Sequence, residues 1–200
     1  MTANLSRIIE SERVKRFNRP ISSPGPFADL RRRAMRAFEE GCHDDVLGMV
    51  REIPGWEQND VALHLVGQAL KYKGELPAAR EFLLRSLELR TQALSELPSR
   101  EARLAVSRTL VVLGEVETGV GDPDKAMRLY AQASALSPDF SPPYINRLCI
   151  ASRAQDGVMA QAIIDEMREN YPAWRADGLL VDILESDGSL NWLRFNLHFW

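Results

Sequence analysis

An all-α chain built from antiparallel helix pairs is the architecture that this sequence favours, and three observations point to it. From Phe27 to about Asp187, apolar residues recur at three- and four-residue spacing, which is the period of one helix face. Runs of β-branched residues that alternate strictly with polar ones are missing from this stretch. Glycine or proline interrupts the pattern at intervals that leave room for helices of about 11 to 20 residues.

The composition limits the size and the environment of the fold. With 200 residues, 45% of them hydrophobic and 26% charged, the chain makes one domain or at most two small ones. A chain of this length buries roughly 70% of its unfolded surface, so it needs no metal or disulfide to form a core. The two cysteines are too few for a disulfide framework and the opening residues lack a hydrophobic signal core, so we expect a cytoplasmic protein. No apolar run approaches the ~20 residues that span a bilayer, and we expect no transmembrane segment.

Charge and composition divide the chain into three parts. Residues 1–26 carry five basic against two acidic side chains and end in the proline-rich stretch 20–26, which predicts a basic arm and a linker. Residues 27–188 carry 19 Lys or Arg against 26 Asp or Glu and form the predicted helical domain. Residues 189–200 form an aromatic tail in which Arg194 is the one formal charge.

Residues 107–140 contain the most specific pattern of the chain. Its fixed positions are Leu110, Leu113, Gly114, Ala126, Tyr130, Ala133 and Pro138. This spacing resembles the tetratricopeptide repeat (TPR) family, in which small residues let two paired helices approach and an aromatic side chain fills the space beside them. The sequence departs from the family pattern at Leu110, where tryptophan is usual, and at Glu117, where tyrosine is usual.

The pattern extends to three further units. A shift of 34 residues gives a second match at 141–174, and a backward comparison gives a match at 60–106 and a degenerate one at 27–59. The matching glycines of the units at 60–106 and 107–140, Gly67 and Gly114, are 47 residues apart instead of 34, which indicates an insertion of 13 residues. Because Leu87–Leu94 is strongly helix-forming, we expect the second helix of the unit at 60–106 to be about two turns longer than usual. The resemblance implies a right-handed α-solenoid of four TPR-like units, with a C-terminal cap helix at 175–188. The competing interpretation is an unrelated helical bundle.

In this family the first helix of each unit lines a concave groove. The matching positions that carry our partner-binding prediction are Arg31, His64, Gln68, Lys71, Arg108, Glu115 and Ile145. These side chains can hydrogen-bond an extended peptide or an acidic helix. The alternative for each is an ordinary solvated side chain. The Lys and Asn set that some family members use to hold chaperone tails is missing here, which disfavours that role.

The aromatic tail is a second candidate contact. Its anchors are Trp192, Phe195, Phe199 and Trp200. Leaving this surface in water would cost several kcal/mol at ~25 cal/mol/Å², so we expect it to be buried. Three alternatives stay open: packing on its own domain, docking on a partner by strand addition or as an aromatic anchor, and contact with a membrane surface. Alternation of apolar residues in the tail suggests a strand. The competing fit is a helix, from the spacing of Leu190, Leu193, Leu197 and Trp200.

Motifs of catalysis and of metal or cofactor binding are missing from the sequence. There is no phosphate-binding Gly-rich loop, nucleophile elbow, His-Glu-x-x-His pair or Cys-x-x-Cys pair. Cys42–Asp45 contains nucleophile, base and carboxylate types. Neighbours in sequence rarely point at one another, and we expect Asp44 or Asp45 to cap the following helix instead. We therefore expect a protein that is not an enzyme and that binds neither a cofactor nor a metal ion.

The predicted function is that of a non-catalytic adaptor or assembly subunit. It would hold a protein or peptide partner in the groove, with the tail as a second contact, and would take no small-molecule substrate. Two alternatives are the regulatory or substrate-recognition subunit of an enzyme complex and a homo-oligomeric scaffold. The formal net charge of −3 gives no reason to expect nucleic acid as a partner.

Overall fold

The computed structural model of the chain describes residues 26–171, and this part is entirely helical. The helices are α2 (Pro26–Glu39), α3 (His43–Arg51), η1 (Trp56–Gln58), α4 (Asp60–Tyr72), α5 (Leu76–Glu96), α6 (Arg100–Val120), α7 (Pro123–Leu136), α8 (Pro142–Arg153) and α9 (Gly157–Asn170). The all-α prediction is confirmed for this range. The predicted basic arm, cap helix and aromatic tail lie outside the described residues.

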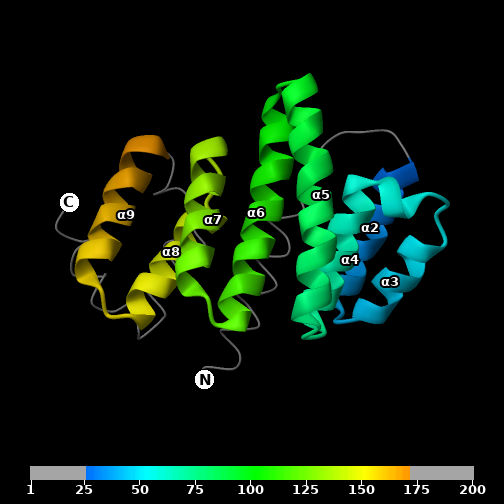
Figure 1. Ribbon diagram of the computed structural model, residues 1–200, viewed down its shortest axis with the longest axis horizontal. Coiled ribbons are helices and arrows are strands. Elements are labelled where there is room, and N and C mark those ends of the chain that lie inside the picture. Colours follow the sequence, from blue (N-terminus) through cyan, green and yellow to red (C-terminus); the bar gives the residue numbers. More distant parts are fainter. Residues whose placement is uncertain (1–25, 172–200) are drawn as a thin grey trace.

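The helices stand side by side in chain order, from α2 and α3 at one end to α9 at the other (Figure 1). Each α-helix packs against the next one along the chain, as short connections require. In addition α2 packs against α4, and α4 packs against α6. We refer to α2, α4, α6 and α8 as the even helices and to α3, α5, α7 and α9 as the odd helices.

Local signals set where the helices begin and end. Asn59 caps α4 by accepting hydrogen bonds from the amides of Val61 and Ala62, at 3.1 and 3.0 Å. Asp122 caps α7, whose first residue is a proline. Gly121 ends α6 at φ 90°, a left-handed conformation that favours glycine. These signals fix the short turns between the helices.

The start of α3 differs from the prediction. The helix begins at His43 with Cys42 as its N-cap, which makes no side-chain cap hydrogen bond. The expectation that Asp44 or Asp45 caps the helix is wrong, because both already lie in its first turn. Carboxylates are favourable there through the helix dipole, and Asp44 also binds Lys73 at 2.6 Å.

Paired helices touch at small residues. A Cβ atom added to Gly67 on α4 would lie 2.5 Å from Cγ of Leu83 on α5, and one added to Gly114 on α6 would overlap the ring of Tyr130 on α7. The alanines that face such contacts, Ala79, Ala126 and Ala160, are fully buried. The close approach of these helices therefore depends on side chains no larger than a methyl group.

Glu117, the unusual residue of the repeat pattern, holds three helices together. Its side chain is 5% exposed, and its Oε1 lies 2.8 Å from Nε of Arg80 on α5 and 2.7 Å from Nζ of Lys125 on α7. A buried carboxylate requires such partners. An ion-pair network therefore occupies this buried position of α6, where the repeat pattern usually has tyrosine.

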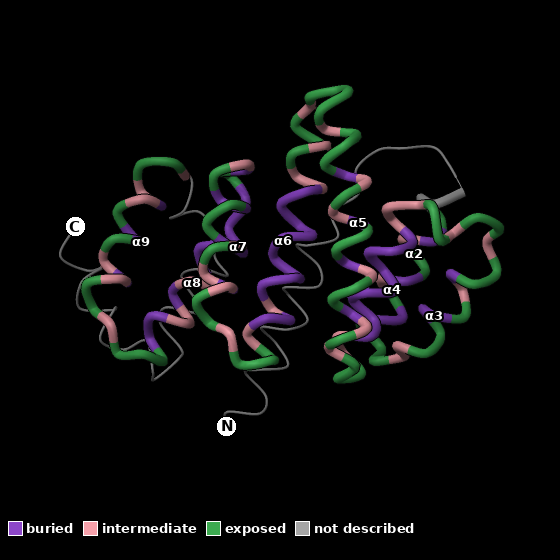
Figure 2. The backbone as a smooth tube through the Cα atoms, in the orientation of Figure 1, coloured by how far each residue is buried: buried purple, intermediate pink, exposed green. Residues whose placement is uncertain are grey.

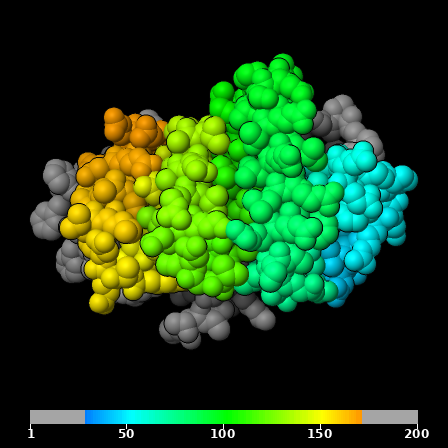
Figure 3. Space-filling view, in the orientation of Figure 1, coloured from blue at the N-terminus to red at the C-terminus, as the bar shows by residue number. Residues whose placement is uncertain are grey.

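α5 and α6 are the longest helices of the described range, with 21 residues each, and they project together beyond their neighbours (Figures 1 and 3). The helix-forming stretch Leu87–Leu94 lies inside α5, as expected. We did not expect α6 to begin at Arg100, seven residues before the predicted unit boundary. The inserted residues are therefore shared between the end of α5 and the start of α6.

The core falls into two clusters. The larger one spans α2 to α7, and the smaller one lies in α8 and α9 around Tyr144, Leu148 and Ile163. Figure 2 shows buried residues concentrated on the even helices, whereas the odd helices carry exposed faces. On α4 all nine residues from Ala62 to Leu70 are buried, and on α6 the same holds from Val106 to Gly114. Within residues 26–171, no helix is both long enough and apolar enough to cross a membrane.

Candidate functional site

A row of polar side chains crosses the even helices, and we call it the polar row. It consists of Arg31 on α2, His64, Gln68 and Lys71 on α4, Arg108 and Glu115 on α6, and Asn146 on α8. Six of these are residues that the repeat pattern assigned to a groove. Asn146 is not among the predicted groove residues, although it directly follows the predicted Ile145. The predicted tail anchors lie outside the described residues.

Most of the polar row is buried, whereas the groove prediction places these side chains on an accessible surface. Gln68, Arg108 and Asn146 are 3%, 5% and 4% exposed, and His64 is buried as well. Arg31, Lys71 and Glu115 are half-buried. Ile145 is also buried, at 2% exposure. The structure thus brings the predicted residues onto neighbouring helices but does not leave them as a solvated surface.

The first cluster of the row centres on Arg90, a residue of the inserted stretch that the repeat pattern could not assign. Its Nε donates to Oδ2 of Asp60 at 2.8 Å, and its Nη1 donates to Oγ1 of Thr109 at 2.8 Å. Oγ1 of Thr109 lies 3.4 Å from Nδ1 of His64. This network joins α4, α5 and α6 beneath the row.

The second cluster joins three of the four even helices, α4, α6 and α8. Nζ of Lys71 lies 2.6 Å from Oε2 of Glu115, and it also sits 3.9 Å above the ring centre of Tyr72. Nδ2 of Asn146 donates to Oε1 of Glu115 at 3.5 Å, a long hydrogen bond. One carboxylate therefore connects α4, α6 and α8.

The centre of the row is electropositive. Burial, followed by the charges of Arg31 and Arg90, lowers the pKa of Arg108 to about 9. Burial lowers the pKa of His64 well below its usual value, and the nearby Arg90, Arg31, Arg108 and Lys71 lower it further. At pH 7 the arginines are charged and His64 is neutral. Arg90 and Lys71 are each paired with a carboxylate, of Asp60 and Glu115.

Two buried acceptors in the row have no donor. Oε1 of Gln68 and Oδ1 of Asn146 accept no hydrogen bond from any residue that the structure describes. Leaving such a group unsatisfied costs about 1–3 kcal/mol. Both are carbonyl oxygens, so N–H or O–H donors would satisfy them.

A scan against models of known protein families finds no match for this chain. A search of curated proteins also finds none. Function is therefore inferred from the residues of the polar row and their surroundings.

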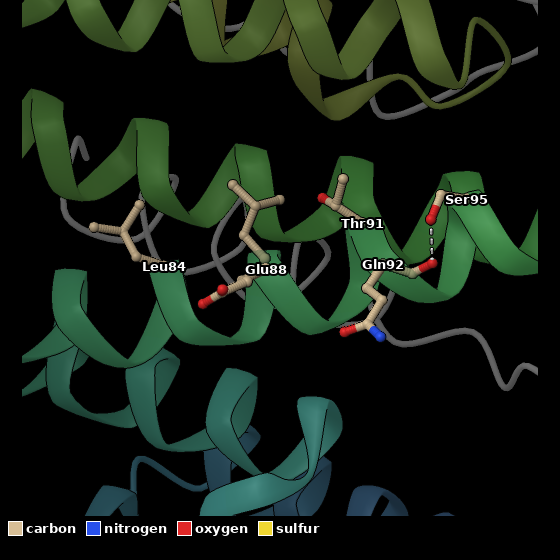
Figure 4. Close-up of a pocket in the computed structure, with 6 residues that line it drawn as sticks. Leu84, Glu88, Thr91, Gln92 and Ser95 are labelled. Atoms are coloured by element: carbon tan, nitrogen blue, oxygen red, sulfur yellow. Dashed lines mark hydrogen bonds between the residues drawn. The ribbon is translucent and has the colours of Figure 1, made fainter.

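A concave feature lies along α5 (Figure 4). It is a cleft of about 520 Å³ lined by Leu84, Leu87, Glu88, Thr91, Gln92 and Ser95, all from one helix. The side chains all lie along one flank of α5. In a small-molecule site, by contrast, side chains from several elements converge. Within residues 26–171, no three His, Cys, Asp or Glu side chains are grouped so that they could hold a metal ion.

Proposed function

We propose that the described helices form four pairs of a right-handed TPR-like solenoid. The pairs are α2 with α3, α4 with α5, α6 with α7, and α8 with α9. Support comes from the contacts of α2 with α4 and of α4 with α6, which is how the first helices of successive repeats stack. Further support comes from Gly67 and Gly114, whose lack of a side chain admits Leu83 and Tyr130. In this arrangement the even helices line the concave side.

We infer that the chain is a non-catalytic adaptor or assembly subunit that binds a polypeptide segment of a partner along the polar row. The observation that carries this inference is the pair of buried carbonyl oxygens of Gln68 and Asn146 without donors. A polypeptide backbone offers N–H donors at regular intervals along its length. Acidic side chains of the same segment would meet the arginines in charge-assisted hydrogen bonds. The aromatic tail would make a second contact.

The burial of the row has a kinetic consequence for this function. A partner segment reaches Gln68 and Asn146 only after the row has opened, since both are nearly inaccessible. Binding that waits for a conformational change has a lower association rate than docking on a preformed surface. We therefore expect slow association that does not increase in proportion to partner concentration.

A peptide-selection experiment tests the proposal. The full-length chain is screened against a displayed library of overlapping peptides that covers a proteome, and the selected peptides are measured against the variants Gln68→Leu and Asn146→Leu. Each variant removes an acceptor. Gln68→Leu introduces an apolar side chain of similar volume, whereas Asn146→Leu also removes the long hydrogen bond to Glu115, so circular dichroism and urea unfolding first establish that each variant is folded. Binding of the selected peptides should fall about tenfold or more, because their N–H groups lose their acceptors.

Arg128→Gln, on the exposed face of α7, is the matched control and should leave binding unchanged. Selected peptides that bind both leucine variants as tightly as the natural chain would overturn the proposal. The same holds if the selection yields no peptide.

A further inference from the structure

The apolar core of the described helices is interrupted at one place, where α8 and α9 meet α6 and α7. We call this boundary the seam. The larger core cluster ends with α7 and the following Phe140, and the smaller one lies in α8 and α9. Among residues 26–171, Ile150 is the one apolar side chain of α8 and α9 that packs on the larger cluster, and Met127 is the one of α7 that packs on the smaller. α7 also packs less extensively on α8 than on α6.

Polar contacts hold much of the seam together. Oγ of Ser134 on α7 lies 3.0 Å from Oε1 of Glu166 on α9 and 3.4 Å from Nη1 of Arg147 on α8. Nδ2 of Asn146 on α8 reaches Oε1 of Glu115 on α6 at 3.5 Å. Separating apolar surfaces costs free energy in proportion to their area, whereas polar groups that separate regain hydrogen bonds with water. The seam is therefore the boundary between described helices that opens at the lowest cost.

The charged groups at the seam remain paired when it opens. Nη1 of Arg147 lies 2.7 Å from Oε2 of Glu166, and both residues belong to the α8–α9 pair, so this ion pair moves with the two helices. On the other side, Glu115 keeps its ion pair with Lys71 on α4, at 2.6 Å. A buried charge that loses its partner is the most costly result of separating two helices. Opening at the seam avoids this cost.

The turn between α7 and α8 provides a pivot at Ser141. The amide of Phe140, a residue of the larger cluster, donates to the carbonyl oxygen of Ser137 at 3.0 Å. The carbonyl oxygen of Ser141 accepts from the amides of Tyr144 and Ile145, at 3.1 and 3.2 Å. Rotation about the backbone between Phe140 and Ser141 breaks none of these hydrogen bonds. Hinges of this kind are a few residues at the ends of elements that absorb a change in φ and ψ.

We propose that α8 and α9 swing as one body about Ser141, and that this motion is the opening through which a partner polypeptide enters the polar row. The swing separates Asn146 from Glu115, which hydrogen-bond each other across the seam, so groups of a partner can enter between them. Helices α2 to α7 stay together, because they share one core cluster. The inference rests on the polypeptide-binding function proposed for the row and identifies the part of the molecule that moves.

Distances between pairs of spin labels in the full-length chain test the motion without any partner. Cys42→Ser and Cys149→Ala first remove the natural thiols. Val120→Cys on α6 and Val158→Cys on α9 then place labels at exposed positions on opposite sides of the seam, and Leu84→Cys with Val120→Cys is the matched pair within the larger body. Double electron–electron resonance should give two distances for the first pair and one for the second.

Two serine-to-alanine substitutions show whether the second distance reports the seam. Ser134 and Ser107 are both buried, but Ser134 reaches across the seam to α9, whereas Ser107 on α6 bonds to the carbonyl oxygen of Ala133 on α7. Ser134→Ala should raise the population of the second distance about fivefold, because one hydrogen bond across the seam is lost. Ser107→Ala should leave it unchanged. A single distance that Ser134→Ala does not change, or an equal response to both substitutions, would overturn the inference.

Binding kinetics separate this inference from the proposed function. The library-selected peptides should associate about fivefold faster with Ser134→Ala than with the natural chain, because the binding-competent population rises by that factor. Ser107→Ala should leave the association rate unchanged. A second distance that responds to Ser134→Ala while the association rate does not would overturn the inference and leave the proposed function standing. A selection without any peptide removes the proposed function, and the label distances then still support the motion of the α8–α9 pair.

Discussion

Gly114 and Gly67 mark the places where paired helices come closest, and each excludes even a methyl group. In Gly114→Ala the new Cβ overlaps the ring of Tyr130, which is itself only 2% exposed. We expect the substitution to lower the free energy of unfolding by about 1–3 kcal/mol, as overpacking does in a dense core. Urea unfolding followed by circular dichroism measures this change.

Gly48 provides the control for that experiment. It lies inside α3, is exposed, and has no atom within 4 Å of an added Cβ. Gly48→Ala should therefore raise the free energy of unfolding by about 0.5–1 kcal/mol through helix propensity alone. Equal effects of the two substitutions would show that Gly114 is not at a helix contact.

Glu117 combines burial with two ion pairs, and Glu117→Gln tests how much the network stabilises the stack. The substitution keeps the shape but leaves Arg80 and Lys125 without their buried carboxylate. We expect a loss of about 2–3 kcal/mol in the free energy of unfolding, measured in urea. Asp29→Asn removes an ion pair with Arg32 in which both side chains are mostly exposed. This control should change the free energy of unfolding by less than about 0.5 kcal/mol.

His64 makes the fold sensitive to acid. Burial and the surrounding cations hold its pKa in the folded chain well below 6.5. As the pH falls below 6.5, His64 therefore binds a proton in the unfolded chain but not in the folded chain. Stability conferred by neutral His64 is full above pH 6.5 and is lost progressively as the pH falls below it. Between pH 6.5 and 5, the free energy of unfolding of the natural chain should fall more steeply than that of His64→Gln, by up to about 1.4 kcal/mol per pH unit. Parallel pH profiles of the two proteins would contradict the assignment.

The roles of several of these residues could be predicted from the sequence, and those of others could not. Gly67, Gly114 and their partners follow from a fixed spacing, because close helix packing admits few residue types. The burial of Gln68 and Arg108 could not be predicted, since exposure depends on what packs on a helix face from elsewhere in the chain. Asn146 lay outside the positions that the repeat pattern assigned to a groove.

At the scale of elements, the projecting ends of α5 and α6 are the least supported part of the described structure. Beyond Arg90, α5 buries no residue fully, and Leu94 is half-buried against the core. We expect Leu94→Ala to speed hydrogen exchange in residues 91–104 while leaving the α4 amides unchanged, because few contacts join the tip to the core. Ser95→Ala, at an exposed position, should have no such effect. Faster exchange throughout the stack would mean that the tip and core open together.

The lengths of α5 and α6 show which helix boundaries the repeat pattern predicts and which it does not. Leu87–Leu94 predicted the longer α5, because its composition is helix-forming over two turns. The template also set a boundary at residue 107, and it therefore missed that α6 starts at Arg100, where Ser99 caps the helix by accepting from the amide of Ala102. Local capping signals located this start better than the period of the repeat did.

At the scale of the whole molecule, the division of the core predicts unequal stability along the row of helices. The smaller cluster is confined to α8 and α9 and their edge contacts. Ile163→Ala should therefore increase hydrogen exchange in α8 and α9 alone, whereas Leu83→Ala should weaken the whole stack. Both residues are fully buried, so the local costs are comparable at about 2–5 kcal/mol. A rise in α4 exchange with Ile163→Ala would show a single cooperative unit.

The turn at residues 97–99, which joins α5 to α6, has a practical use. It lies at the tip of the projection, where Leu97 is 75% exposed and no side chain of the polar row is found. Exposed tips of this kind accept inserted domains without loss of folding. A fluorescent reporter inserted between Leu97 and Pro98 would leave both chain ends unmodified and would keep Ser99 as the cap of α6. Engagement of the polar row could then be followed in living cells.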